Sequence, residues 1–170
     1  ALTFGIDYYL KPAKLKTYPE TEWKNDSAER KRQDAFLIMA MTSIDPKETA
    51  RYAVFGAAYN FSYRIARISA LSSGFEWILD ASLQKKLKRE NDDSDYQRGG
   101  ILLGHEFLLG HFTFSQQLGI YIYNPSQRGD PVYQRYGLNY YIKKKFVIGF
   151  NLKAHRHVAD FMDLRIGLSF

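Results

Sequence analysis

Residues 161–170, FMDLRIGLSF, alternate between apolar and polar side chains up to an aromatic last residue. The even-numbered positions from 162 onward are apolar, and Asp163, Arg165, Gly167 and Ser169 lie between them. Successive side chains of a β-strand point to opposite faces, so this segment has one apolar face and one polar face. An apolar face toward lipid, a polar face toward a lumen and an aromatic at the interface are typical of a transmembrane β-barrel strand.

Alternation of this kind predicts strands along the whole chain, at 2–10, 35–44, 51–64, 70–82, 99–109, 112–123, 133–142, 146–155 and 160–170. Residues 35–44 are apolar on both faces, and a buried helix turn would have the same pattern. Most segments exceed the usual strand length in soluble sheets and suffice for a tilted crossing of a bilayer, about 9–11 residues. We expect an all-β fold, an antiparallel transmembrane β-barrel of eight or nine strands, or the C-terminal part of a larger barrel.

The connections between the predicted strands alternate in length. Short links at 65–69, 110–111 and 143–145 are expected on the periplasmic side, together with Phe170, and the longer loops 83–98 and 124–132 outside. The highly charged stretch 84–95 is predicted to be a loop. The chain then divides into a leading strand with a charged periplasmic linker, residues 1–34, and a barrel portion, residues 35–170.

The composition agrees with a barrel and excludes several other classes. The 170 residues are 45% hydrophobic and 16% aromatic, with a mean hydropathy of −0.39. Abundant aromatics suit either a soluble β-sandwich core or the aromatic girdles of a membrane barrel. No stretch approaches the ~20 apolar residues of a spanning helix. The absence of Cys excludes disulfides and thiolate metal sites, and no cofactor is expected.

The net charge of +6 indicates an anionic partner. No recognition-helix or RNA-binding signature is present, so anionic lipid is favoured over nucleic acid. Ala1 opens directly on a strand-like pattern without a signal peptide. Because an exported barrel needs a signal, we expect the sequence to be processed or to be part of a longer chain.

Three segments together resemble a known family: 95–125 (DYQRGGILLGHEFLLGHFTFSQQLGIYIYNP), 133–141 (YQRYGLNYY) and 153–161 (KAHRHVADF). They are similar to the C-terminal half of the outer-membrane acyloxyacyl hydrolases, proteins like the lipid A 3-O-deacylases of Gram-negative, Bacteroidetes-type bacteria. The resemblance covers about residues 50–170. It implies a location in the bacterial outer membrane, a carboxylic ester hydrolase activity on lipid A, and contact with outer-membrane lipids and lipopolysaccharide. We also expect the barrel insertion machinery to bind the last strand, which ends in Phe170.

The catalytic residues that the resemblance implies have no counterpart in this sequence. The resemblance implies a His base and a Ser nucleophile two residues apart on one strand, on the same face. Here the residues two positions after the four histidines (105, 111, 155 and 157) are Phe107, Thr113, His157 and Ala159. No catalytic residue is therefore assigned. Either the pair lies upstream of Ala1 in a longer chain, or the protein is a non-catalytic barrel subunit of an outer-membrane assembly with other membrane proteins as partners.

Two further groups of titratable residues have a functional and a structural interpretation. One group consists of His155 and His157, with Asp160 or Asp163 opposite, and it suits a general base or a metal site. Two imidazoles without a third ligand favour an ordinary histidine pair at the rim or in the lumen. No metal site is therefore assigned. Charged residues at strand positions that point inward are expected to pair with one another in the lumen: Arg64, Glu76, Asp80, Glu106, Arg135, Lys153 and Arg165. His105 is interpreted as packing or lumen polarity.

The basic residues Lys85, Lys86, Lys88 and Arg89 lie in the predicted outer loop. They are candidates for contact with lipopolysaccharide phosphates. The competing interpretation is a solvated loop, since several aspartates follow them. A wide pore is not expected, because eight strands leave an interior just large enough for side chains.

Overall fold

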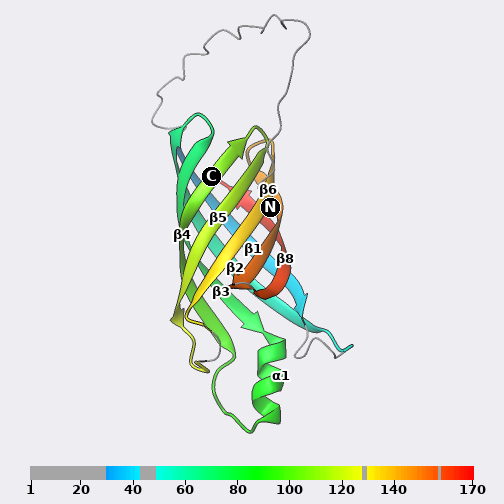
Figure 1. Cartoon of the computed structure of the whole chain (residues 1–170). Coiled ribbons are helices and arrows are strands. Elements are labelled where there is room, and N and C mark those ends of the chain that lie inside the picture. The colour runs from blue at the N-terminus through cyan, green and yellow to red at the C-terminus, as the bar shows by residue number, and fades with distance from the viewer. Residues whose placement is uncertain (1–29, 43–48, 128–129, 157) are drawn as a thin grey trace, which may run out of the picture.

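The computed structural model describes residues 30–42, 49–127, 130–156 and 158–170 (Figure 1). These residues form an antiparallel transmembrane β-barrel with one short helix. The elements are β1 (Lys31–Thr42), β2 (Tyr52–Ala66), β3 (Ser69–Asp80), α1 (Ala81–Arg89), β4 (Gln97–Leu109), β5 (Phe112–Tyr123), β6 (Val132–Ile142), β7 (Phe146–His155) and β8 (Val158–Ser169). The described residues contain no helix long and apolar enough to cross a bilayer.

The barrel closes between its first and last strands. β1 pairs antiparallel with β2 on one side and with β8 on the other, where Ala35 lies opposite Leu168. Backbone hydrogen bonds join Gln33 and Phe170 in both directions, at 3.1 and 2.8 Å. Closure means that these eight strands make the full circumference, so the alternative of a fragment of a larger barrel is wrong. The ninth predicted strand, residues 2–10, lies outside the described residues.

The predicted strands from 51 to 170 match β2 to β8 closely, whereas β1 begins at Lys31 rather than at residue 35. Its first four residues are polar, and they were therefore assigned to the charged linker. In the barrel their side chains alternate as in any other strand. Arg32 and Asp34 point into the lumen, and Lys31 and Gln33 point outward.

The two ends of the barrel differ. At the end opposite α1, here called the turn end, short connections at 67–68, 110–111 and 143–145 join neighbouring strands. Phe170 lies at the same end, as its pairing with Gln33 shows. The other end, here called the loop end, carries α1 and the longer connections (Figure 1). The predicted alternation of short and long connections is confirmed from β1 to β7, whereas the β7–β8 connection is short although it lies at the loop end.

The prediction that the stretch 84–95 is a loop is wrong for its first half, which belongs to α1. The Asp80 side chain caps this helix by accepting hydrogen bonds from the backbone N–H groups of Ser82 and Leu83, at 2.9 and 3.2 Å. Leu83 and Leu87, one turn apart, are buried. Two apolar residues in a charged run were too weak a periodic signal to predict the helix.

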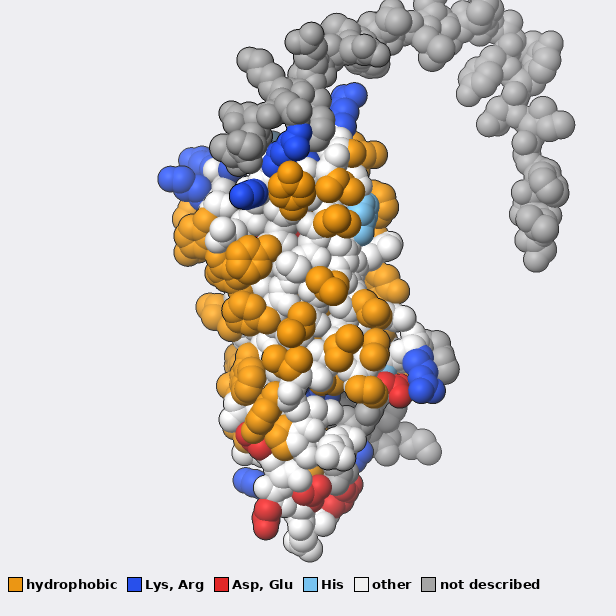
Figure 2. Space-filling view, turned by 90° about the vertical axis from the view of Figure 1, so that its left-hand side faces the viewer, with side chains coloured by type: hydrophobic (Ala, Val, Ile, Leu, Met, Phe, Trp, Pro, Cys, Tyr) orange, Lys and Arg blue, Asp and Glu red, His pale blue; other side chains and the backbone are white. Residues whose placement is uncertain are grey.

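The outer wall is apolar, as expected of a lipid-facing surface (Figure 2). Large exposed hydrophobic side chains occur on every strand, among them Leu37, Phe55, Phe61, Leu103, Leu118, Leu138, Phe150 and Ile166. Exposed aromatics lie near both ends of this belt: Tyr63, Phe112 and Phe146 toward the turn end, and Trp77 and Tyr123 toward the loop end. An apolar band between two aromatic girdles is the lipid-facing pattern of a transmembrane barrel.

Candidate functional site

The middle of the lumen is filled by a buried charge cluster, which consists of Glu76 on β3, Arg135 on β6, Lys153 on β7, and Asp163 and Arg165 on β8. The Glu76 carboxylate forms ion pairs with Arg135 at 2.9 Å, Arg165 at 3.4 Å and Lys153 at 3.7 Å. Asp163 pairs with Arg135 and, at 2.9 Å, with Arg165. Every charge in the cluster has a partner, as burial requires. This pairing supports the structural interpretation of these residues.

A second ion pair network lies closer to the turn end. Arg32 pairs with Asp34 at 2.9 Å and with Glu106 at 2.6 Å. The hydroxyls of Tyr141 and Ser62 donate to the same two carboxylates, at 2.8 and 2.7 Å. The prediction that inward-phase charges pair in the lumen is thus confirmed for Glu106 as well. Asp80 instead caps α1, and the Arg64 guanidinium donates to backbone carbonyls of the adjoining turn.

A histidine–carboxylate pair lies at the loop end. Nδ1 of His155 is 3.4 Å from the Asp160 carboxylate across the β7–β8 hairpin. Asp160, and not Asp163, is therefore the acidic partner of this histidine; Asp163 belongs to the buried charge cluster. His157 lies outside the residues whose side chains are described. Within the part of the chain that the structure describes, no group of three or more His, Cys, Asp or Glu residues could hold a metal.

The other ring nitrogen of His155, Nε2, is buried and has no hydrogen-bond partner among the described residues. The imidazole packs against the rings of Tyr121 and Tyr133, both with centroids 6.0 Å away. Lys153 lies over the same two rings, 4.7 and 4.2 Å from their centroids. The site is thus an Asp–His pair beside two tyrosines, in which the second ring nitrogen of the histidine has no described partner.

Two glycines make room for this arrangement. A Cβ on Gly100 would collide with the hydroxyl of Tyr133, and a Cβ on Gly119 would collide with its ring. Only glycine at these two positions leaves room for the side chain of Tyr133. The sequence alone could not reveal this contact, because it depends on the register of β4, β5 and β6.

A serine–histidine contact occurs on the outer wall. Ser69 Oγ lies within hydrogen-bond distance of His105 Nε2, and the imidazole packs edge-on against Phe107, with centroids 4.6 Å apart. The histidine therefore faces outward, while its neighbour Glu106 points into the lumen. This pair lies toward the turn end, on adjacent strands rather than two residues apart on one strand. The sequence pattern could not identify it, because a diagonal contact is visible only once the register is known.

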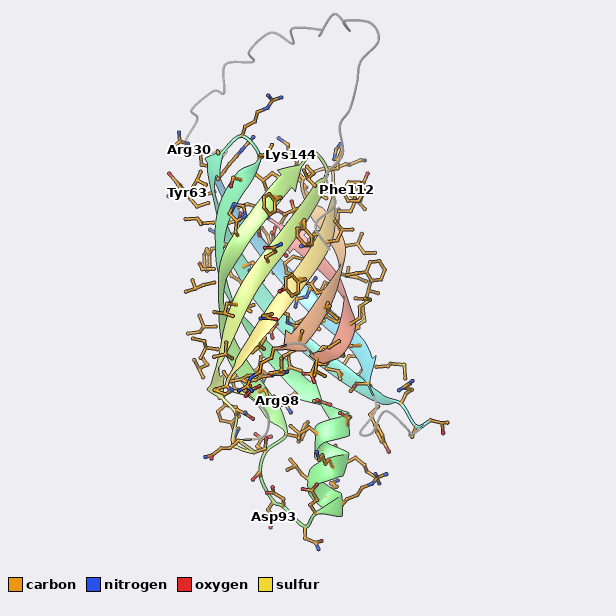
Figure 3. The ribbon with its side chains drawn as sticks, viewed as in Figure 1. Arg30, Tyr63, Asp93, Arg98, Phe112 and Lys144 are labelled. Atoms are coloured by element: carbon orange, nitrogen blue, oxygen red, sulfur yellow. The ribbon has the colours of Figure 1, made fainter. Side chains whose placement is uncertain are left out.

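The basic residues predicted to contact phosphates lie on α1 at the loop end. Lys85, Lys86, Lys88 and Arg89 are all exposed on this helix. The acidic residues that follow them include Asp93, at the far tip of this region (Figure 3). The structure thus places the basic residues together on one helical segment, and contact with phosphate stays a prediction.

Comparison with protein families identifies the barrel as a whole. The family model described as acyloxyacyl hydrolase, C-terminal domain, matches residues 31–170. The match begins at the first residue of β1 and ends after β8, so it covers every strand described above. A search among curated proteins finds no match.

Proposed function

The chain belongs to the acyloxyacyl hydrolase C-terminal domain family, and on this premise we propose that it is an outer-membrane barrel that hydrolyses an acyl ester of lipid A. The family match over the entire barrel is the observation that carries the proposal. The apolar belt with its two aromatic girdles supports a location in the membrane. With the turn end on the periplasmic side, the loop end lies beside the outer leaflet, where lipid A is found.

The pair formed by Asp160 and His155 at the loop end is the geometry best suited to ester hydrolysis. The carboxylate orients the imidazole through Nδ1, which leaves Nε2 to accept a proton. Since the sequence has no serine two residues after a histidine, we propose water as the nucleophile. His155 takes a proton from water as its oxygen bonds to the acyl carbon. The acyl C–O bond then breaks, and the same proton passes to the departing sugar oxygen, which yields a fatty acid and an alcohol.

The basic face of α1 would serve binding rather than chemistry. Lys85, Lys86, Lys88 and Arg89 are exposed at the same end of the barrel as His155. Each cationic side chain beside an anionic membrane surface contributes about 1 kcal/mol to the free energy of binding. In this proposal they hold the lipid A phosphates while the acyl chains lie along the apolar belt.

A second candidate function is a non-catalytic barrel subunit of an outer-membrane assembly. The observation that favours it is the lack of a His-x-Ser pair in the sequence. Burial of His155 Nε2 beside two tyrosine rings also suits a structural histidine. In this case other outer-membrane proteins would be the partners, and lipid A would be unchanged.

Mass spectrometry of lipid A separates the two candidates. Cells that lack the gene would be complemented with the wild type, with His155→Gln or with His105→Gln. We expect the wild type and His105→Gln to remove one acyl chain from lipid A, and His155→Gln to leave it intact. Heat-modifiable mobility in gels would verify that each variant forms the barrel.

Two other results would change the assignment. If His105→Gln alone loses the activity, the reaction belongs to the contact between Ser69 and His105 on the outer wall. If lipid A is identical with and without the wild-type gene, hydrolysis is wrong. Stable co-purification with another outer-membrane protein would then support the subunit function.

A further inference from the structure

A cavity of about 890 Å³ opens at the turn end of the lumen. We call it the turn-end mouth. Its basic lining residues come from β1 and the residue before it, from the end of β2, and from the β2–β3 and β6–β7 connections: Arg30, Lys31, Arg32, Arg64, Arg67 and Lys144. Figure 3 labels Arg30 and Lys144 at this end of the barrel, opposite Arg98 and Asp93. Among the described residues that line the cavity, none is an aspartate or glutamate.

At the floor of the mouth one cation is paired with two carboxylates. Arg32, the deepest of these cations, is held by Asp34 and Glu106 at 2.9 and 2.6 Å. At the rim, in contrast, Lys31, Arg67 and Lys144 are exposed and form no ion pair with any carboxylate that the structure describes. A recess whose charged side chains are all cationic, between low-dielectric walls, concentrates its field and attracts ions of the opposite sign. The ligand that fits is therefore an anion.

The same cavity has apolar parts at its edge. Ile68, Leu109 and Phe170 line it and are also more than half exposed, at 55, 56 and 71%. An anion with an attached hydrocarbon chain would satisfy both kinds of lining. A pocket of this volume lies within the usual range for small-molecule sites, about 300–1,000 Å³.

The position of the mouth relative to the membrane points to the source of the anion. Tyr63 and Phe112 are exposed on the outer wall near this end, as Figure 3 shows, at 44 and 46%. Aromatic side chains mark the level of lipid headgroups. The rim cations thus stand at headgroup depth, at the end of the barrel remote from α1.

We propose that the turn-end mouth binds the phosphate headgroup of an anionic phospholipid, with Arg67 and Lys144 contacting the phosphate and the apolar rim contacting the start of the acyl chains. This site would be separate from the lipid A site at the loop end, and it does not depend on hydrolysis. A free phosphate compound without acyl chains could contact the same cations. The experiment must therefore distinguish a phospholipid from such a compound.

Native mass spectrometry of the full chain in detergent would measure the affinity. The probes are phosphatidylglycerol, phosphatidylcholine and glycerol phosphate. The variant is Arg67→Gln with Lys144→Asn; asparagine tolerates the positive φ of 57° at position 144. The matched control is Arg51→Gln with Arg156→Asn, which removes two exposed cations at the loop end, again with a positive φ, 54°, at position 156.

We expect the wild type and the control to prefer phosphatidylglycerol over phosphatidylcholine, and the mouth variant to bind it at least tenfold more weakly. The expectation follows from a loss of about fivefold per cation removed next to an anionic headgroup. Equal weakening in both double variants would overturn the site, since only overall charge would then matter. Glycerol phosphate bound as tightly as the lipid would overturn the lipid as the source.

Discussion

The buried charge cluster and the turn-end mouth both contain arginine and lysine, but they differ in whether these cations are paired with carboxylates. In the cluster, Glu76 and Asp163 pair with every nearby cation, and the side chains are almost completely buried. In the mouth, the rim cations are exposed and form no ion pair with any Asp or Glu that the structure describes. In the first region every charged side chain already has a buried partner, so the cluster is structural. Lack of pairing makes the second region a candidate binding site.

The largest effect is expected from Glu76→Gln. This change would leave Arg135, Lys153 and Arg165 with too little negative charge in the middle of the lumen. Breaking a buried ion pair by removing one partner costs about 3–5 kcal/mol. The free energy of unfolding in detergent, measured by urea titration, should fall by that amount.

The control for this change is Asp130→Asn, which breaks the exposed pair between Asp130 and Arg156, 3.0 Å apart. Exposed ion pairs contribute at most about 1 kcal/mol. If Glu76→Gln is as mild as the control, the cluster does not stabilise the barrel.

An intermediate effect is expected from Arg32→Gln at the floor of the mouth. Asp34 and Glu106 would lose their cation but keep the hydroxyl donors Tyr141 and Ser62. Hydrogen bonds to charged groups are worth about 1.5–3 kcal/mol, so the same urea titration should show a loss of about 2 kcal/mol. Lys31→Gln, one residue away on the outward face, should change stability little. A loss as large as that for Glu76→Gln would place Arg32 within the buried charge cluster rather than at its boundary.

The smallest effect on stability is expected from the double change Arg67→Gln and Lys144→Asn. Neither side chain has a described ion pair to lose, and surface substitutions usually stay within about 0.5 kcal/mol. The unfolding midpoint should therefore match the wild type, although phospholipid binding is lost. Marked destabilisation would mean that the rim cations stabilise the fold and are not held available for a ligand.

The sequence predicted the barrel because lipid and lumen impose opposite side-chain chemistry on alternate residues. Residues 162–170 illustrate this: Met162 and Ile166 are exposed on the wall, and Asp163 and Arg165 are buried inside. The start of β1 was missed because Lys31 and Gln33 are polar even though they face outward, beyond the apolar belt. Near the ends of a strand, both faces are polar, and the alternation that identifies a strand disappears.

The candidate sites were less predictable than the strands, because they depend on register and closure. Asp160 and His155 are close in sequence, and the pair was among the candidates. The contact between Ser69 and His105, and the grouping of Lys31 with Arg67 and Lys144, join residues on different strands. No local pattern contains that information. The periodicity of one strand says which face a residue occupies, but not which residues of other strands stand beside it.

The hydrogen bonds between Gln33 and Phe170 have a consequence for how the protein assembles. They belong to the pairing of β1 with β8, which closes the barrel. The strands between β1 and β8 must therefore be paired before this closing contact forms. Until then both edge strands expose unpaired backbone groups, which hydrocarbon does not tolerate. Contacts so distant in sequence also form slowly. Closure and insertion into the bilayer are therefore expected to be one coupled, rate-limiting event.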